Sequence, residues 1–246
     1  MTQELVLADI ADSRFYSDGK DGPVVEVHQR RMEGPVRLVK VTERKHCPRT
    51  TGQVFLSDAS LFRQDPEGDQ HDSTHPSKHL RVRVKFPDGW RDLEGVQETA
   101  WQYSPGFIYC MTMERDVEPS VDLGVFGSKK DPVASRLLLD VMDFAAMVGH
   151  SLAVELGLER VTVVHGKVRY FDYEGRDSEL HRTHVLQSHG GASPSVEATF
   201  IKGRAFRPEN EYRFVFLCDR KGFEGAVLPV GHYARGGEPI TVWEAL

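Results

Sequence analysis

The sequence predicts an α+β fold made of mixed or antiparallel sheets with few helices. Two observations carry this prediction: candidate strands outnumber candidate helices, and the strongest strands alternate apolar with polar side chains. Such alternation is typical of antiparallel strands with one solvated face, whereas strands of a doubly wound parallel sheet are apolar throughout. The 246 residues contain no internal repeat and are sufficient for one large domain. We therefore expect residues 1–246 to form a single domain.

The clearest strand covers Leu80–Phe86. Apolar side chains at every second position of this segment alternate with Arg81, Arg83 and Lys85. This period of two predicts a strand with one apolar face and one basic, solvated face, and Pro87-Asp88-Gly89 supplies a turn after it. The other predicted strands are Val36–Val41, Val54–Leu56, Phe107–Met113, Ser151–Leu156, Val161–Val164, Lys167–Phe171, Val196–Ile201, Glu211–Leu217 and Ile240–Trp243.

One helix is predicted between Asp131 and Gly149. Asp131 is suited to cap its N-terminus, and Pro132 is suited to its first position. Apolar residues from Leu138 to Val148 recur at helical spacing, opposite a polar face. Gly149 is a suitable residue for its end.

Two long polar segments, residues 64–78 and 174–195, are rich in His, Ser, Asp and Gly and are predicted to be loops. Loops of this length are uncommon in compact domains unless they are functional or mobile. Residues 1–34 are expected either to pack on the domain or to form an N-terminal arm.

The composition is that of a globular protein, with 28% charged and 39% hydrophobic residues. A net charge of −6 argues against a strongly electrostatic nucleic-acid binder but leaves room for a local basic face. The sequence begins without the features of a signal peptide, and no apolar stretch is long enough to span a membrane. The three cysteines are scattered without CxxC spacing, which fits a reducing compartment. We expect a cytoplasmic protein without membrane association.

The densest group of polar residues lies near the C-terminus at Glu209, Glu211 and Arg213. If the chain from Glu209 to Leu217 is extended, these three side chains share one face of a strand. Apolar residues continue that face, so the charges are expected to enter the interior, where they must be paired. One interpretation is a structural ion-pair cluster in which Arg213 or Arg207 neutralises the glutamates. The other is a site in which one glutamate is held for catalysis and the other positions a nucleophile.

The predicted strand Phe107–Met113 places Cys110 and Thr112 on one face. A buried cysteine and a threonine bonded to the backbone are the simplest interpretation. Cys110 has no activating cation beside it in the sequence, which argues against a nucleophilic thiol.

Histidines form the third polar group. His71, His75 and His79 are spaced at intervals of four, and three more histidines follow within residues 174–195. That spacing on a helix would align imidazoles for a metal, but Pro76 interrupts the run. We expect solvated loop histidines and no metal site. The alternative is a metal-dependent nuclease or hydrolase that combines the histidines with the acidic residues Asp65, Asp69 or Asp72.

The order of four segments resembles that of a large bacterial family of unknown function. Val54–Glu67 resembles the family's Ser…Phe-Asn-Asp-Pro box, Tyr109–Thr112 its Cys-Phe-Ser strand, and Val164–Asp172 the strand that follows. Lys202–Arg213 resembles its Lys…Glu-Asn-Glu-Tyr/Trp-Arg ending, which is the most specific of the four. The resemblance covers residues 36–217, which is most of the chain.

More distantly, the chain resembles ADP-ribosyltransferases of the Arg–Ser/Thr–Glu type. Both have an early basic residue on a strand, a middle strand ending in Ser or Thr, and a late Glu-x-Glu. The resemblance implies a split sheet and NAD as a substrate. Arg37 would then steady the dinucleotide phosphates and Thr112 would support the local structure. Glu211 would bind ribose hydroxyls and stabilise the oxocarbenium-like transition state, while Glu209 would activate the acceptor.

Arg14 and Lys40 are alternatives to Arg37 for the phosphates, and Arg213 is also assigned to NAD binding. Two functions stay open. One is an NAD-consuming, ADP-ribosyltransferase-like enzyme or NAD glycohydrolase, a toxin or anti-phage effector that modifies nucleic acid or protein. The other is a noncatalytic nucleic-acid- or protein-binding sensor module, in which the Glu–Arg cluster is structural and the basic face of Leu80–Phe86 touches nucleic acid.

Overall fold

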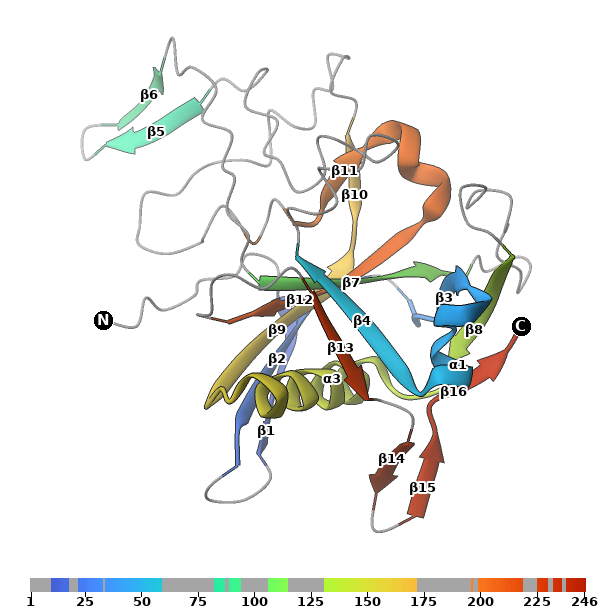
Figure 1. Cartoon of the computed structure of the whole chain (residues 1–246). Helices are drawn as coiled ribbons and strands as arrows, with labels where there is room; N and C mark the ends of the chain where they lie inside the picture. Colours follow the sequence, from blue (N-terminus) through green and yellow to red (C-terminus); the bar gives the residue numbers. More distant parts are fainter. Residues whose placement is uncertain are drawn as a thin grey trace.

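A ten-stranded mixed sheet and one long helix packed against it are the main elements of the structure, a computed structural model (Figure 1). The sheet is antiparallel except where β2 (Val24–Arg30) pairs with β9 (Arg160–Lys167). The fold is therefore rich in strands and poor in helices, as predicted, while an ADP-ribosyltransferase-like split sheet stays a prediction. The structure describes residues 10–17, 22–32, 34–58, 82–86, 89–93, 106–114, 131–171, 196, 199–218, 225–229, 232–235 and 238–246.

The path of the sheet runs from the N-terminal strand to the C-terminal strand. Its order is β1 (Ile10–Ser17), β2, β9, β12 (Glu211–Leu217), β7 (Gly106–Met113), β3 (Leu38–Glu43), β8 (Pro132–Leu137) and β16 (Trp243–Ala245). Two further strands branch from this path, because β4 (Gln53–Asp58) pairs with β7 and β13 (Gly225–Pro229) pairs with β4.

Strand β7 is the branch point of the sheet. Along one edge it pairs with β12 from Gly106 to Thr112. Along the other edge its first half pairs with β4, at Phe107 and Ile108, and its end pairs with β3, at Thr112 and Met113. Strands β12 and β7 therefore lie in the interior of the sheet, and their side chains are buried on both faces.

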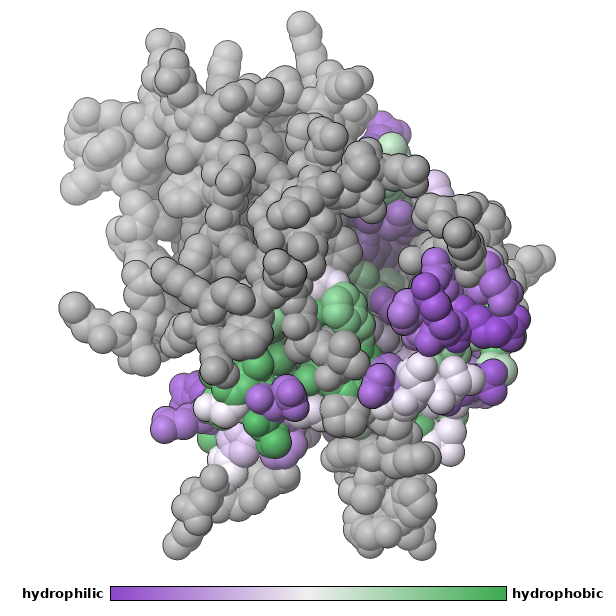
Figure 2. Space-filling model, in the orientation of Figure 1, coloured by the Kyte–Doolittle hydropathy of each residue, from purple (hydrophilic) through white to green (hydrophobic). Residues whose placement is uncertain are grey.

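The smaller elements are two-stranded sheets and short helical turns. They are β5 (Val82–Phe86) with β6 (Gly89–Leu93), β10 (Arg169–Phe171) with β11 (Ile201–Gly203), β14 (His232–Arg235) with β15 (Glu238–Thr241), and the turns η1 (Arg44–His46), α1 (Pro48–Thr51) and η4 (Arg204–Glu209). On the face shown in Figure 2, hydrophilic residues gather over η1 and α1, where Arg44, Lys45, His46 and Arg49 are exposed.

Several predicted strands are confirmed. Strand β4 contains the predicted Val54–Leu56, β7 contains Phe107–Met113, β9 contains Val161–Val164, and β12 is the predicted Glu211–Leu217. The predicted Val36–Val41 overlaps β3 with a shift of two residues. The described part of Leu80–Phe86 forms β5, while Lys167–Phe171 and Ile240–Trp243 are each divided between two strands. No strand was predicted from the sequence at β1, β2, β6, β8, β13 or β14.

The predicted helix was wrong in its position. Pro132–Leu137, the predicted first part of the helix, forms β8, because pairing with β3 and β16 outweighs the local signals for a helix start. Asp131 does not cap a helix; it has a φ of 47° and its carboxylate pairs with Arg44 at 2.6 Å. The helix α3 begins instead at Val141, where the carboxylate of Asp140 accepts hydrogen bonds from two backbone N–H groups.

The end of the helix was also misplaced. Helix α3 (Val141–Leu156) continues through Ser151–Leu156, the segment predicted as a strand, and ends at Gly157 with a φ of 62°. The predicted strand Val196–Ile201 was wrong as well, since Thr199 and Phe200 form a turn and only Ile201 belongs to β11.

Helix α3 packs on β2 and β9 through a glycine (Figure 1). Gly149 lies in the middle of the helix and is buried. A Cβ at this position would lie 2.8 Å from Val25 Cγ1 and 3.0 Å from Val163 Cγ2. Gly149 was predicted to end the helix, but its role is to let the helix approach the sheet.

An aromatic cluster fills the core beneath α3. The ring of Phe144 lies 5.2 Å from Phe214, 5.9 Å from Tyr109 and 5.5 Å from Trp243, measured between centroids. Offset and edge contacts of this kind add to the burial of apolar area. They join α3 to β12, β7 and β16, so the helix holds the centre of the sheet to its C-terminal edge.

One histidine is buried on the α3 side of the sheet. The Nδ1 atom of His165 lies 2.6 Å from the Tyr212 hydroxyl, and its Nε2 atom lies 3.0 Å from the Met142 sulfur. Burial lowers the pKa of His165 to about 3, so the imidazole is neutral at ordinary pH. A neutral imidazole is a donor at one nitrogen and an acceptor at the other, which suits these two partners.

Replacing Gly149 by alanine should destabilise the protein, although alanine is the better helix former. The added methyl group would force α3 away from the valines of β2 and β9. We expect the free energy of unfolding, measured by urea denaturation, to fall by about 1–3 kcal/mol. Val154→Ala on the exposed side of the same helix is the control and should be nearly neutral. Equal stability of Gly149→Ala and the wild type would show that this close approach is not needed.

Candidate functional site

A buried ion-pair cluster occupies the face of the sheet opposite α3. The Nε of Arg213 donates to Glu211 Oε1 at 2.5 Å, and the Nζ of Lys202 donates to Glu211 Oε2 at 3.0 Å. Lys202 also donates to Glu209 Oε2 at 2.7 Å, and Nη1 of Arg213 donates to the Thr199 carbonyl at 2.7 Å. Both oxygens of the Glu211 carboxylate are therefore held by cations.

Alternation along β12 places this cluster. Tyr212, Phe214 and Phe216 belong to the core beneath α3, so Glu211 and Arg213 face the other side of the sheet. That side is closed by a second, smaller apolar cluster, which consists of Ile108, Val164, Val196, Phe200 and Val215. As a result, the side chains of Glu211 and Arg213 are only 5% and 1% exposed.

Burial and the neighbouring charges determine the protonation state of each carboxyl group in the cluster. Burial by itself would raise the pKa of the Glu211 carboxyl, but the nearby Arg213 and Lys202 outweigh it and hold the pKa well below its usual range. Glu209 behaves differently, because burial raises its pKa and Lys202 offsets this only in part. Its side chain is 23% exposed, so it is the one carboxylate of the cluster with access to solvent.

Lys202 joins the two ends of a short segment. It lies in β11, directly before η4, while Glu209 is the last residue of η4. The ammonium group also lies 4.7 Å from the centre of the Phe206 ring, within η4. By binding Glu209 and Glu211 together, Lys202 fixes η4 against the first residue of β12.

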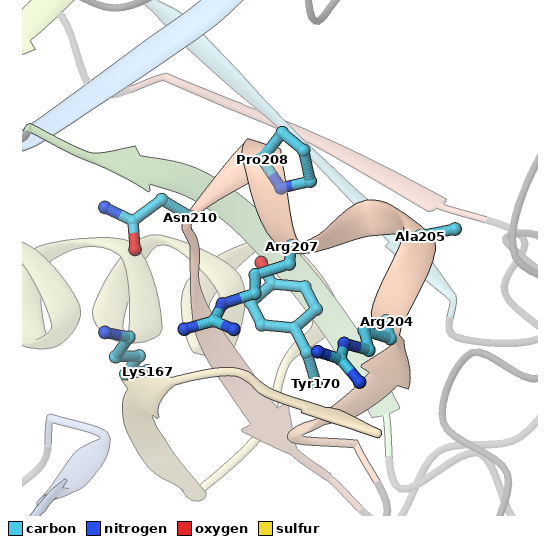
Figure 3. A pocket seen from close by; sticks show the side chains of 7 residues that line it. All are labelled: Lys167, Tyr170, Arg204, Ala205, Arg207, Pro208 and Asn210. Atoms are coloured by element: carbon cyan, nitrogen blue, oxygen red, sulfur yellow. The ribbon is translucent and has the colours of Figure 1, made fainter. Parts of the chain in front are cut away.

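A basic cavity lies beside this segment (Figure 3). Its volume is about 610 Å³, within the range of sites for small ligands. Figure 3 shows the cationic groups of Lys167, Arg207 and Arg204 following one another across the cavity. The residues that line it are Lys167, Tyr170, Arg204, Ala205, Arg207, Pro208 and Asn210, and this lining contains no carboxylate.

Two hydrogen-bonded residues connect the cavity to the sheet. The hydroxyl of Tyr170 accepts a hydrogen bond from the backbone N–H of Glu211 at 2.7 Å. Asn210 has a φ of 46° and exchanges backbone and side-chain bonds with Met113, each at 2.9 Å. A left-handed conformation suits asparagine better than most residues, so the chain can turn from η4 into β12 at this position.

The cavity is positively charged in a protein whose net charge is −6. Lys167 and Arg207 are exposed, and no carboxylate within the described part of the chain forms an ion pair with either of them. Glu209, two residues after Arg207 in the sequence, is already bound to Lys202. The lining therefore offers the cations of Lys167 and Arg207 to an external anion.

The structure brings together three of the predicted site residues. Glu209, Glu211 and Arg213 form one cluster, but Arg213 is directed inward and does not line the cavity. Arg207 was considered as a partner of the glutamates; it lines the cavity instead, and Lys202 takes that role. Lys202 belongs to the polar segment Lys202–Arg213 of the sequence, but its place beside Glu211 follows from the pairing of β10 with β11.

Thr112 and Arg37 occupy different surroundings. Thr112 is buried in β7 directly opposite Glu211, so its backbone lies beside the cluster. Arg37 is exposed just before β3, and its carbonyl accepts a hydrogen bond from the N–H of Glu114 at 2.9 Å. Neither residue is part of the cavity lining. Their assignment to NAD binding stays a prediction.

The alternative basic residues are also engaged elsewhere. Lys40 donates to the Cys110 carbonyl at 2.6 Å and lies 4.3 Å from the centre of the Tyr109 ring. Arg14 is on the edge strand β1 and pairs with Asp12 at 3.1 Å. Burial and the nearby Glu211 carboxylate raise the pKa of the Cys110 thiol, which keeps it protonated. This agrees with the prediction that Cys110 is not a nucleophile.

The remaining sequence features lie largely outside the described residues. The histidine-rich loops, residues 64–78 and 174–195, are among them, as are their neighbouring acidic residues. Arg81 lies outside as well, whereas Arg83 and Lys85 belong to β5, opposite Asp92 and Trp90 of the hairpin.

Comparisons with known proteins give no relative from which to infer a function. No family model matches the chain, and no curated protein and no solved structure is significantly similar to it. Within the described ranges, no three His, Cys, Asp or Glu residues are grouped so that they could hold a metal ion. None of the described helices is long and apolar enough to cross a membrane. The function is therefore inferred from the cluster and the cavity.

Replacing Glu211 by glutamine should destabilise the fold strongly. The neutral side chain would leave the buried charges of Arg213 and Lys202 without their carboxylate, which costs about 3–5 kcal/mol in the free energy of unfolding. Glu209→Gln is the matched control on the same lysine. Because Glu209 is partly exposed, its replacement should cost about 1 kcal/mol or less.

The same variant should alter the dependence of stability on pH. The pKa of Glu211 is lowered from its ordinary 4.5, so its contribution is complete above that pH and is lost as the pH falls below it. Urea denaturation of the wild type should therefore show a loss of stability in acid that is smaller in Glu211→Gln. Identical acid profiles and equal stabilities would contradict a structural role for this carboxylate.

Proposed function

We propose that the protein is a noncatalytic recognition module that binds a phosphate-bearing ligand in its basic cavity. The observation that carries this proposal is the cavity itself, in which Lys167, Arg204 and Arg207 surround a space of about 610 Å³ without a carboxylate in the lining. Guanidinium groups match the geometry of phosphate oxygens, and a lysine adds a compact positive charge.

The net charge of the protein supports a local site rather than a broad basic surface. With a net charge of −6, the chain as a whole repels polyanions. The cavity places positive charge where β9, β10 and η4 meet. Such a site favours a phosphate group presented by a small ligand or by the end of a longer one.

The ion-pair cluster supports the proposal by holding the cavity wall. Lys202, two residues before η4, binds both Glu209 at the end of η4 and Glu211 at the start of β12. Arg204 and Arg207 are therefore presented from a segment that is held in place before the ligand arrives. Fixing a binding segment in advance reduces the entropy lost on binding. In this proposal the Glu–Arg cluster is structural, and binding is the function.

A second candidate is the NAD-consuming enzyme implied by the resemblance to ADP-ribosyltransferases. One observation favours it: Glu209 has partial access to solvent, has a raised pKa, and lies between two residues of the cavity lining, Pro208 and Asn210. A dinucleotide held by the basic residues would then lie near a carboxylate. The engagement of Glu211 and Arg213 in the interior supports the binding module instead.

The binding module predicts that pyrophosphate binds in the cavity. Isothermal titration calorimetry should detect binding to the wild type that weakens as the salt concentration rises. Lys167→Ala and Arg207→Ala should each lower the affinity roughly tenfold, because each removes one charged contact. Arg160→Ala is the matched control, since Arg160 is an exposed cation at the other end of the same strand as Lys167. Equal losses in all three variants, or no binding at all, would contradict the proposal.

The same proposal predicts that NAD is not consumed. Purified protein incubated with NAD, with and without cell lysate, should release no nicotinamide and transfer no label. Glu209→Gln, whose folding is checked by its circular dichroism spectrum, should behave like the wild type. Nicotinamide release by the wild type that disappears in Glu209→Gln would establish the enzyme and overturn the noncatalytic module.

A further inference from the structure

The basic cavity contains an aromatic ring that a phosphate by itself would not require. Tyr170 lines the cavity, and its hydroxyl is bound to the backbone N–H of Glu211 at 2.7 Å. This bond fixes the ring at its far end and leaves its surface to form part of the lining. Pro208 is a second flat apolar surface in the same lining. A planar aromatic group such as a nucleobase gains affinity by stacking on such a ring.

The lining also contains a hydrogen-bond acceptor of defined orientation. The side-chain nitrogen of Asn210 donates to the Met113 carbonyl at 2.9 Å. A carbonyl oxygen only accepts, so this bond determines which end of the amide faces the backbone. The Oδ1 atom therefore points the other way, and Figure 3 shows it on the side of Lys167. Among the described residues no donor is bound to this oxygen.

Cations, a fixed ring and a single acceptor define a specific chemistry. We propose that the ligand of the basic cavity is a nucleotide whose base carries an exocyclic amino group. Its phosphates would contact Lys167 and Arg207, its base would stack on Tyr170, and its amino group would donate to Oδ1 of Asn210. This inference rests on the proposed function and names the class of ligand that the same site selects.

The Oδ1 atom of Asn210 provides the selectivity between bases. The amino groups of adenine and cytosine donate hydrogen bonds, whereas hypoxanthine and uracil present a carbonyl oxygen at the same position. That oxygen would face Oδ1 of Asn210 without a proton between them, so one hydrogen bond is lost and both acceptors stay unsatisfied. A loss of this kind reduces affinity by roughly tenfold or more.

The inference is tested by comparing nucleotides that differ only in that group. Isothermal titration calorimetry of the wild-type protein should show that ADP binds at least roughly tenfold more tightly than IDP, and CDP more tightly than UDP. Pyrophosphate, which has the same phosphates and no base, should bind more weakly than ADP. These comparisons need no variant and do not depend on how a substituted protein folds.

Two pairs of variants assign the selectivity to residues. Asn210→Gly should remove the difference between ADP and IDP, because glycine lacks the Oδ1 acceptor and accepts the φ of 46° at this position. Tyr170→Leu should lower ADP affinity towards that of pyrophosphate, whereas Tyr170→Phe keeps the ring and should retain most of the affinity for ADP.

The outcomes separate this inference from the proposed function. If pyrophosphate binds but ADP and IDP bind equally well, the choice of an amino-bearing base is wrong and the phosphate-binding module stands. If ADP binds no more tightly than pyrophosphate, base stacking is wrong in the same way. If neither pyrophosphate nor any nucleotide binds, the proposed function fails together with the inference.

Discussion

The need to neutralise one buried carboxylate organises the functional half of this protein. Glu211 enters the sheet at the start of β12, where its side chain is almost completely removed from water. An isolated charge in that position would be very costly, so both carboxylate oxygens are bound by cations, Arg213 from the same strand and Lys202 from β11. Since β11 and η4 follow one another directly, this requirement also positions η4.

Strand β12 separates an aromatic part of the interior from a charged part. On the α3 side, β12 contributes Tyr212, Phe214 and Phe216 to an aromatic core whose one buried imidazole, His165, is neutral. On the opposite side it contributes charged groups that are satisfied by one another. Strand alternation makes this separation possible, because successive side chains point to opposite faces.

The cations of the C-terminal region serve two purposes according to their access to water. Arg213 and Lys202 form ion pairs with the buried Glu211 and stabilise the fold. Lys167 and Arg207 are exposed at the cavity, where together with Arg204 they form a positively charged recess on a net-negative protein. The internal pairs hold η4, which forms part of the wall of the recess. In the proposed function the charge of the recess selects the ligand, so that stability and recognition both depend on η4.

Local patterns in the sequence determined much of this arrangement. These patterns were sufficient to locate β12, nearly all of β7 and the central part of β9, and the alternation along β12 showed that Glu211 and Arg213 would share a face and require partners. Tertiary structure decided the rest. Pro132–Leu137 was predicted as the start of a helix but becomes β8, because hydrogen bonding to β3 and β16 contributes more than local preference. The position of Lys202 beside Glu211 depends on the pairing of β10 with β11, and the cavity is lined by Lys167 together with residues 204–210, which are distant from it along the chain. No local pattern encodes such contacts, since they arise only when packing brings separate strands together.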